Sequence, residues 1–218
     1  MHFDDRNDLL QPGYLPLETG IQRHGDGSVT VAALTRMPRC RAKMVDWWFG
    51  WLGGTDQYKL WHPRDHISSD WQDRTPGSYI GAKHLVEETM VGGEVHRLRI
   101  HFRDPREVFD PVGYAAVDGI AFCARAGRSD KPVNVGHMAH FVRNTDVGCE
   151  MRTRFWFGDV HHQDLRTDLP EEVKAMVRRE SMTDDFCRRL MQHAIEEMGY
   201  LADLLPVLYR QATGDATI

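Results

Sequence analysis

The sequence predicts an α+β fold in which a curved antiparallel sheet packs around one long C-terminal helix and encloses a cavity. Between residues 78 and 157 the apolar residues recur with a period of two, which is typical of half-buried antiparallel strands. From Phe186 to Leu208 they recur at helical spacing, which indicates an amphipathic helix. The length of 218 residues, 41% of them hydrophobic, favours one domain with a sizeable core.

Composition argues against several classes of protein. With 27 basic and 32 acidic residues the net charge is −5, so no basic surface for nucleic acid or for an anionic membrane is expected. No uncharged apolar run approaches the roughly 18 residues of a membrane span, and the acidic start is unlike a signal peptide, which predicts a cytoplasmic protein. The four cysteines are scattered without a CxxC pair, so we expect buried thiols. Any metal would therefore use carboxylates and some of the 12 histidines.

Residues 1–37 are rich in Gly, Pro and Asp and predict an extended N-terminal arm with one short strand at Ser28–Leu34. Tyr14, Leu15 and Leu17 make this arm too apolar to be wholly free. We expect it to pack on its own domain or on a second subunit, and we predict a homodimer.

The segment 41–52 places Met44, Trp47, Trp48 and Trp51 at helical spacing, which predicts a short helix with an aromatic face that packs in the core.

A hairpin is predicted next, with strands Tyr79–Val91 and Val95–Phe102 around the turn at Gly92-Gly93. Its second strand alternates apolar and polar residues, so one face is buried and the other is wet. Three further strands complete an antiparallel meander: Ile120–Arg125, Val133–Arg143 and Glu150–Phe157.

Two helices close the chain. Pro170 with two following glutamates begins the first, and the capping-box pattern Ser181-Met182-Thr183-Asp184 begins the second. The predicted organisation is the arm, one catalytic domain over 38–212, and a tail over 213–218.

The apolar stripe of the last helix contains His193 and Glu197. Burying an ionised carboxylate without a partner costs several kcal/mol, so Glu197 needs a cation, a metal or a raised pKa. The i,i+4 spacing places the two side chains on neighbouring turns, where they could share one metal ion. The alternative is that Glu197 pairs with an arginine or with His193 itself.

Two more segments offer ligands, and each leaves a choice open. His62 and His66 lie in a stretch where glycine and proline oppose long regular structure, as in loops that carry ligands. In the hairpin, a two-residue loop would turn Glu87 inward opposite Leu98, whereas a three-residue loop with a glycine bulge would turn Glu88 inward instead.

Two histidines and two carboxylates from a loop, a strand and a helix form a plausible shell for Zn²⁺, with water as a further ligand. A sheet around a long helix also encloses a cavity into which the polar pair on the buried helix face would point. This is the helix-grip, or Bet v 1-like, arrangement.

Several motifs in order resemble the diacetylphloroglucinol hydrolase and phloretin hydrolase family over roughly residues 12–210. They are Asp46-Trp47-Trp48-Phe49, the run Tyr58-Lys59-Leu60-Trp61 leading to His66, Val86-Glu87-Glu88, His140–Thr145, Glu150–Trp156 and His193-xxx-Glu197. The resemblance implies a helix-grip fold and a zinc-dependent hydrolase that cleaves the carbon–carbon bond between an acyl group and a phenol ring. The zinc ligands it implies are His66, Glu88, His193 and Glu197.

The resemblance also implies that His140 and Tyr58 are active-site residues near the phenolic oxygens of a small aromatic ketone. Whether His137 shares the role of His140 is left open by the sequence. Phe155 stands where the family has a second active-site tyrosine, and it cannot donate a hydrogen bond. We therefore expect a substrate with fewer ring hydroxyls or a larger apolar ring. Candidate cavity walls are Trp61, Phe155 and Trp156.

Two other functions use the same features. A non-enzymatic carrier of the helix-grip fold would bind a small molecule without a metal. An Fe(II) oxygenase would use two histidines and one carboxylate, and a second carboxylate would fill the position that oxygen needs.

Overall fold

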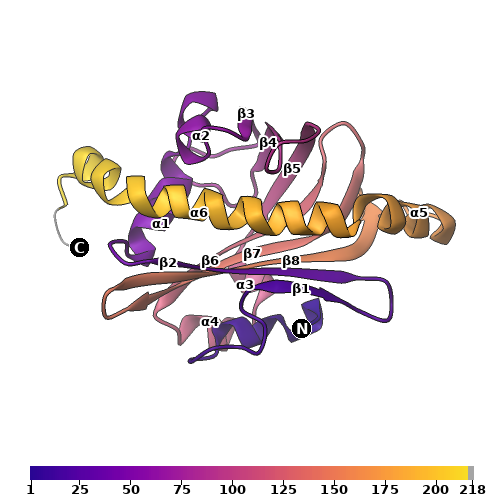
Figure 1. Ribbon diagram of the computed structural model, residues 1–218, viewed down its shortest axis with the longest axis horizontal. Helices are drawn as coiled ribbons and strands as arrows, with labels where there is room; N and C mark the ends of the chain where they lie inside the picture. The colour runs from indigo at the N-terminus through magenta and orange to yellow at the C-terminus, as the bar shows by residue number, and fades with distance from the viewer. Residues whose placement is uncertain (216–218) are drawn as a thin grey trace.

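One eight-stranded antiparallel sheet wraps around one long helix in the computed structural model, which describes residues 1–215 (Figure 1). Across the sheet the strands follow the order β1-β2-β8-β7-β6-β5-β4-β3. Their bounds are β1 (Gly20–Arg23), β2 (Val29–Met37), β3 (His66–Gln72), β4 (Lys83–Glu88), β5 (His96–Arg103), β6 (Gly119–Arg128), β7 (Val133–Thr145) and β8 (Gly148–His162). The predicted helix-grip fold is confirmed.

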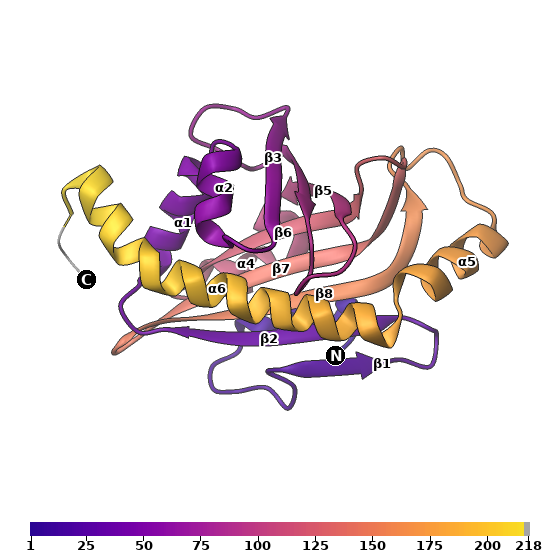
Figure 2. The ribbon, with the colours of Figure 1, turned by 45° about the horizontal axis from the view of Figure 1, so that its top comes forward.

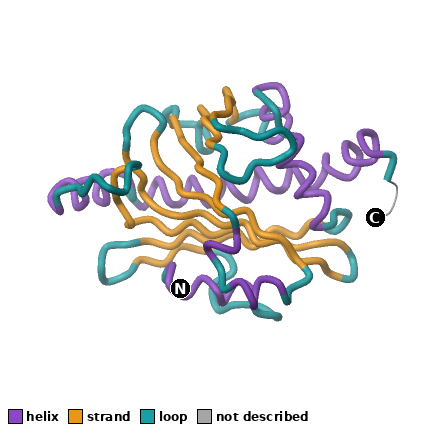
Figure 3. The backbone as a smooth tube through the Cα atoms, turned by 180° about the vertical axis from the view of Figure 1, so that it is seen from behind, coloured by secondary structure: helices purple, strands orange, loops and turns teal. Residues whose placement is uncertain are grey.

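Helices cover both faces of this sheet. They are η1 (Phe3–Leu10), α1 (Ala42–Trp51), α2 (Thr55–Trp61), α3 (Pro105–Val108), α4 (Pro111–Ala115), α5 (Glu171–Ser181) and α6 (Asp184–Thr213). Helix α6 crosses the inner face, and α1 and α2 lie beside it (Figure 2). Figure 3 shows the sheet from behind, with α6 beyond the strands and η1 on the outer side. Within residues 1–215 no helix is both long and apolar enough to cross a membrane.

The strands have two buried faces, so the sheet separates two apolar cores. The larger one lies between the inner face, α1 and α6, and Met138 and Val142 of β7 belong to it. Ala139 and Phe141 of the same strand belong to the outer core, which η1 and the α3–α4 segment cover. This division follows from the period of two, because successive side chains of a strand point to opposite faces.

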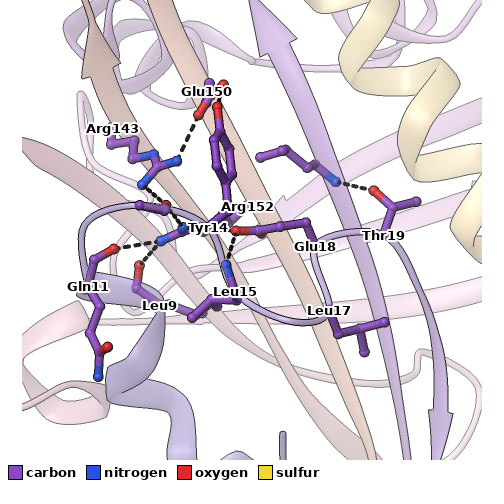
Figure 4. A network of polar contacts seen from close by, with 12 residues as sticks. Leu9, Gln11, Tyr14, Leu15, Leu17, Glu18, Thr19, Arg143, Glu150 and Arg152 are labelled. Carbon is purple, nitrogen blue, oxygen red and sulfur yellow. Dashed lines mark hydrogen bonds and ion pairs between the residues drawn. The ribbon is translucent and has the colours of Figure 1, made fainter.

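The N-terminal segment is more structured than the predicted extended arm. A 3₁₀ helix forms at Phe3–Leu10, and the predicted strand extends to Met37. The arm packs on its own domain, because Leu9 is buried in the outer core and the partly buried Leu15 packs against that core. Figure 4 shows how Arg152 of β8 binds the arm: its guanidinium donates hydrogen bonds to the carbonyl of Leu9 (2.8 Å) and to the carboxylate of Glu18 (2.9 Å), among other acceptors.

The predicted helix over 41–52 is present as α1, and the two C-terminal helices follow. Thr183, not Ser181, caps α6, because the Thr183 hydroxyl accepts a hydrogen bond from the Phe186 amide. The helix ends at Gly214, whose φ of 72° is the left-handed conformation that favours glycine. It therefore reaches one residue into the predicted tail, and residues 216–218 of that tail lie outside the described residues.

The predicted hairpin is present as β4 and β5, but its connection, residues 89–95, is longer than either loop considered from the sequence. Val86 pairs with Leu98, and Glu88 pairs with His96. Both proposed registers are therefore wrong. The segment with His62 and His66 is also more regular than expected, because α2 ends at Trp61 and β3 begins at His66.

Candidate metal centre

Four side chains that could bind a metal converge where α6 passes the ends of β3 and β4. His66 is the first residue of β3 and pairs with Glu88, the last residue of β4. His193 and Glu197 reach the same point from successive turns of α6. The Nε2 atom of His66 lies 3.5 Å from Glu197 Oε1 and 3.8 Å from Glu88 Oε2, and His193 Nε2 lies 3.9 Å from Glu88 Oε1. Ligand atoms about 2.1 Å from a tetrahedral zinc lie about 3.4 Å apart, so this spacing suits one ion.

The Nδ1 atom of each of these two imidazole rings already has a hydrogen-bond partner. His66 Nδ1 lies 2.8 Å from the Tyr58 carbonyl, and His193 Nδ1 lies 3.1 Å from Asp65 Oδ2. Carbonyl and carboxylate partners of this kind fix the proton on Nδ1 and leave Nε2 for a metal. Among the described residues, the buried Nε2 atom of His66 has no hydrogen-bond partner. Such an atom is costly unless something binds it, and a metal would do so.

The electrostatics of the cluster also favour a cation. Burial raises the pKa of Glu197, but the close approach of His66 and the positive charge that His66 and His193 can carry outweigh burial and lower the pKa. Burial lowers the pKa of His193, but the carboxylates of Glu88, Glu197 and Asp65 outweigh it and raise the pKa. The carboxylates thus attract positive charge into a buried place, which a proton or a metal can supply.

The alternative ligand Glu87 points away from the cluster. Its carboxylate accepts hydrogen bonds from Ser68 (3.1 Å) and Arg97 (2.8 Å) on the outer edge of the hairpin. Glu88 points inward, because it shares the buried strand face with His84 and Val86.

The alternative histidine, His62, is also fully buried, but it contacts Asp65 and the ring of His193. Its Nδ1 accepts a hydrogen bond from the Asp65 amide at 3.1 Å, and its ring stacks on His193 at 4.8 Å. His62, Asp65 and His193 could form a second three-residue metal group. In that group Asp65 Oδ2 lies 3.1 Å from His193 Nδ1, a hydrogen-bond distance that is shorter than the spacing of two ligands on one zinc ion. The geometry therefore favours His66 and Glu88.

A cavity of about 420 Å³ opens beside the four residues. Its wall contains Glu88, His193 and Glu197 of the candidate metal site, and four further predicted site residues: Tyr58, Trp61, His140 and Phe155. The rest of the wall is mainly apolar and includes Leu98, Ile100, Phe102, Met138, Phe157 and Leu190. Such a cavity suits a small ligand with an aromatic ring.

Tyr58 joins the cavity to the candidate metal site. Its hydroxyl donates a short hydrogen bond to Glu88 Oε2, and its ring stacks on His66 at 3.6 Å. Burial, together with the charges of Glu88 and Glu197, raises the pKa of Tyr58 well above its usual value. Tyr58 therefore keeps its proton and orients Glu88.

His140 is a neutral imidazole in the cavity wall. Its Nδ1 lies 2.8 Å from the hydroxyl of Thr153, and burial lowers its pKa to about 4. His137 is three residues away on the same strand and therefore points to the opposite face. There it binds Asp159 at 2.8 Å and stacks on Phe3, so it does not share the position of His140.

The structure corrects the prediction for Trp156. Phe155 faces the cavity, but Trp156 lies in the outer core with Phe109 and Phe141. Neighbouring residues of one strand cannot both line the same face. Phe157, two residues after Phe155, lines the cavity in place of Trp156.

Asp65 is a part of the site that the sequence reasoning missed. Besides His193, its carboxylate accepts hydrogen bonds from the Thr89 hydroxyl (3.0 Å) and the Val91 amide (2.7 Å). Burial raises the pKa of Asp65, but these hydrogen bonds, led by the one from His193, hold it well below its usual range. Its position directly before His66 was the only signal in the sequence.

The comparisons with known proteins agree with the resemblance drawn from the motifs. The chain is 26% identical over 230 residues to the 2,4-diacetylphloroglucinol hydrolase of Pseudomonas protegens, covering 95% of this chain and 73% of that protein. It is 28% identical over 229 residues to phloretin hydrolase of Eubacterium ramulus, covering 96% and 78%. Among solved structures, a major latex-like protein of Panax ginseng aligns with a TM-score of 0.49 and 9% identity, over 82% of this chain and 97% of that chain.

A family model described as the DAPG hydrolase PhiG domain matches residues 1–210, which include all four residues of the candidate metal centre. Because this match spans nearly the whole chain, the protein belongs to the DAPG hydrolase PhiG domain family.

Proposed function

We propose that this protein is a zinc-dependent hydrolase that cleaves the carbon–carbon bond between the acyl group and the phenol ring of an acylphloroglucinol-like ketone. The convergence of His66, His193 and Glu197, with Glu88 within 4 Å of both imidazoles, at the wall of a ring-sized cavity carries the proposal. Both relatives named above are hydrolases whose names specify phenolic ketones, which supports the substrate class.

His66, Glu88, His193 and Glu197 would hold the zinc ion. The donor set fits, because zinc accepts imidazole nitrogen and carboxylate oxygen and because no residue among 1–215 donates to or accepts from the Nε2 atom of His66. When bound, zinc lowers the pKa of a coordinated water to about 7 and polarises a carbonyl oxygen.

The reaction consumes one water. Its oxygen forms a bond to the acyl carbon, the bond between that carbon and the ring carbon breaks, and the ring carbon receives a proton. This is a reverse-Claisen hydrolysis, which yields a carboxylic acid and the free phenol. The ring can leave because its own oxygens spread the negative charge as an enolate or phenolate.

The neutral His140 would bind a ring oxygen and help move the proton to the ring carbon. The Tyr58 hydroxyl already donates a hydrogen bond to Glu88, so its oxygen would accept a hydrogen bond from a ring hydroxyl. Trp61 and Phe155 would hold the ring and exclude bulk water from it.

Metal analysis of the purified full chain, followed by assays on acylated phenols, tests the proposal. We expect about one zinc per chain, and we expect Glu197→Gln and His193→Ala to lose both zinc and hydrolysis. Glu196→Gln is the matched control, because the neighbouring Glu196 binds Arg64 and Gln192 at the partly exposed side of α6. It should keep both properties.

Protein that contains no metal and is unchanged by His193→Ala would overturn the proposal in favour of a carrier. Iron in place of zinc, with oxygen consumed during turnover, would favour an oxygenase.

A further inference from the structure

His84 is a buried histidine in the cavity wall that the mechanism above does not use. It lies on the inward face of β4, four residues before Glu88, and only 2% of its surface is exposed. Trp71 stacks on its ring at 4.2 Å, and the Tyr58 ring meets it nearly at right angles at 5.4 Å. The ring is therefore held firmly between two aromatic side chains.

Ser69 fixes the orientation of this histidine. The Ser69 hydroxyl lies 2.7 Å from His84 Nε2. The Ser69 backbone is itself held by Thr55, whose hydroxyl accepts from the Ser69 amide at 3.1 Å and donates to the Ser69 carbonyl at 3.3 Å. Among the described residues the Ser69 hydroxyl has no second acceptor, so it donates to Nε2 and leaves the His84 proton on Nδ1.

His140 has the same construction on β7. Its Nδ1 atom lies 2.8 Å from the Thr153 hydroxyl, which has no other acceptor among the described residues; by the same argument the hydroxyl donates to Nδ1 and the proton of the neutral ring is on Nε2. Burial lowers the pKa of His84 to about 3 and that of His140 to about 4, so both rings remain neutral near pH 7. The cavity thus has two neutral imidazoles, each oriented by a hydroxyl and each with one N–H still free to bind a ligand.

We propose that His84 binds a second ring oxygen of the substrate, so that His84 and His140 together hold a ring with oxygens in a 1,3 relationship. This inference rests on the proposed function, because the charge of the leaving ring develops on those oxygens and pre-oriented N–H donors stabilise it there. Phe155 lines the same cavity without a polar atom, so a third ring hydroxyl gains no donor from it. The substrate class is therefore a ketone whose ring has two oxygens.

Binding of simple phenols to the purified, metal-loaded chain tests this assignment without depending on catalysis. We expect His84→Phe to weaken the binding of benzene-1,3-diol about tenfold, the scale of one hydrogen bond, and to leave the binding of phenol unchanged. Isothermal titration calorimetry gives both dissociation constants, and metal analysis verifies that the variant retains its zinc.

Ser69→Ala is a milder second variant, and Ser68→Ala is its matched control, because the Ser68 hydroxyl faces Glu87 on the other side of the strand. Ser69→Ala should weaken binding of the diol several-fold and lower kcat/KM for a dihydroxyphenyl ketone in proportion. Ser68→Ala should change neither.

Equal diol affinities in the wild type, His84→Phe and Ser69→Ala would overturn the inference, even for a chain that hydrolyses acylphenols. Conversely, diol binding that depends on His84 in a chain that cleaves no acylphenol would support this inference and overturn the proposed function.

Discussion

At the scale of single residues, Asp65 connects the candidate metal centre to the hairpin. It holds His193 through one oxygen and binds the backbone after β4 through the same carboxylate. A carboxylate in this position fixes the ring of a metal-binding histidine and makes its free nitrogen more basic.

We therefore predict that Asp65→Asn lowers the zinc affinity of the folded protein by 10- to 100-fold, the usual effect of losing such a partner. Competition with a chromogenic chelator measures the affinity. Asp70→Asn is the control, because Asp70 is exposed and caps only the neighbouring Trp71 amide. An unchanged affinity in Asp65→Asn would show that the carboxylate does not orient His193.

Phe155 lines this cavity at the position where the family resemblance implies a tyrosine. Its ring meets His140 edge-on at 6.2 Å, so a hydroxyl added to it would lie in the wall of the same cavity.

We predict that Phe155→Tyr shifts the ratio of kcat/KM roughly tenfold from dihydroxyphenyl ketones toward trihydroxyphenyl ketones, because the new hydroxyl supplies about one hydrogen bond. Paired assays on the two ketones measure this ratio. If the ratio stays constant in a variant that folds and binds zinc, Phe155 does not contact the substrate ring.

At the scale of elements, β8 has a separate function on each face. Its inner face supplies Phe155 to the cavity wall and Thr153 to the contact with His140, and its outer face supplies Arg152 and Arg154 to the N-terminal arm. Both arginine side chains are fully buried, and both pair with Glu18 of the arm.

We predict that Arg152→Met lowers the free energy of unfolding by about 3–5 kcal/mol, because it removes a buried charge that binds Glu18 and three backbone carbonyls of the arm. Chemical denaturation followed by tryptophan fluorescence measures the change. Arg36→Met should cost no more than about 1 kcal/mol, because Arg36 is 73% exposed where it pairs with Glu150. Equal effects of the two substitutions would contradict a structural role for the arm contact.

At the scale of the whole molecule, the arm belongs to the fold that it covers. Its strands β1 and β2 are hydrogen-bonded into the main sheet, and Leu9 is fully buried in the outer core. Tyr14 is the part of the arm that stays available to a second subunit, with 60% of its surface exposed.

We still predict a two-fold homodimer, with Tyr14 and the exposed Val147 as its apolar contacts. Light scattering on the full chain and on a Tyr14→Ser, Val147→Ser double variant tests this, because deleting residues 1–37 would also remove two strands of the sheet. A dimeric wild type and a monomeric variant are the expected result. A monomeric wild type would contradict the prediction.

The sequence by itself determined the class of fold and half of the candidate site. The period of two along the middle strands and the helical period after Thr183 are local patterns. Each predicts its element correctly, because burying the apolar side of a strand or helix stabilises the fold. His193 and Glu197 could be recognised for the same reason, since two polar residues in an apolar helical stripe need a partner. Trp156 could also have been excluded from the cavity wall, because it directly follows Phe155 on one strand and therefore points to the opposite face.

Only the tertiary structure decided which other residues meet that pair. The length of the connection between β4 and β5 sets which glutamate turns inward, and the start of β3 sets which histidine stands opposite it. Asp65, His84 and the hydroxyl that orients each wall histidine act through residues distant in sequence. Those contacts depend on strand register and on where α6 crosses the sheet. Neither produces a repeating pattern of apolar residues that could be recognised in the sequence.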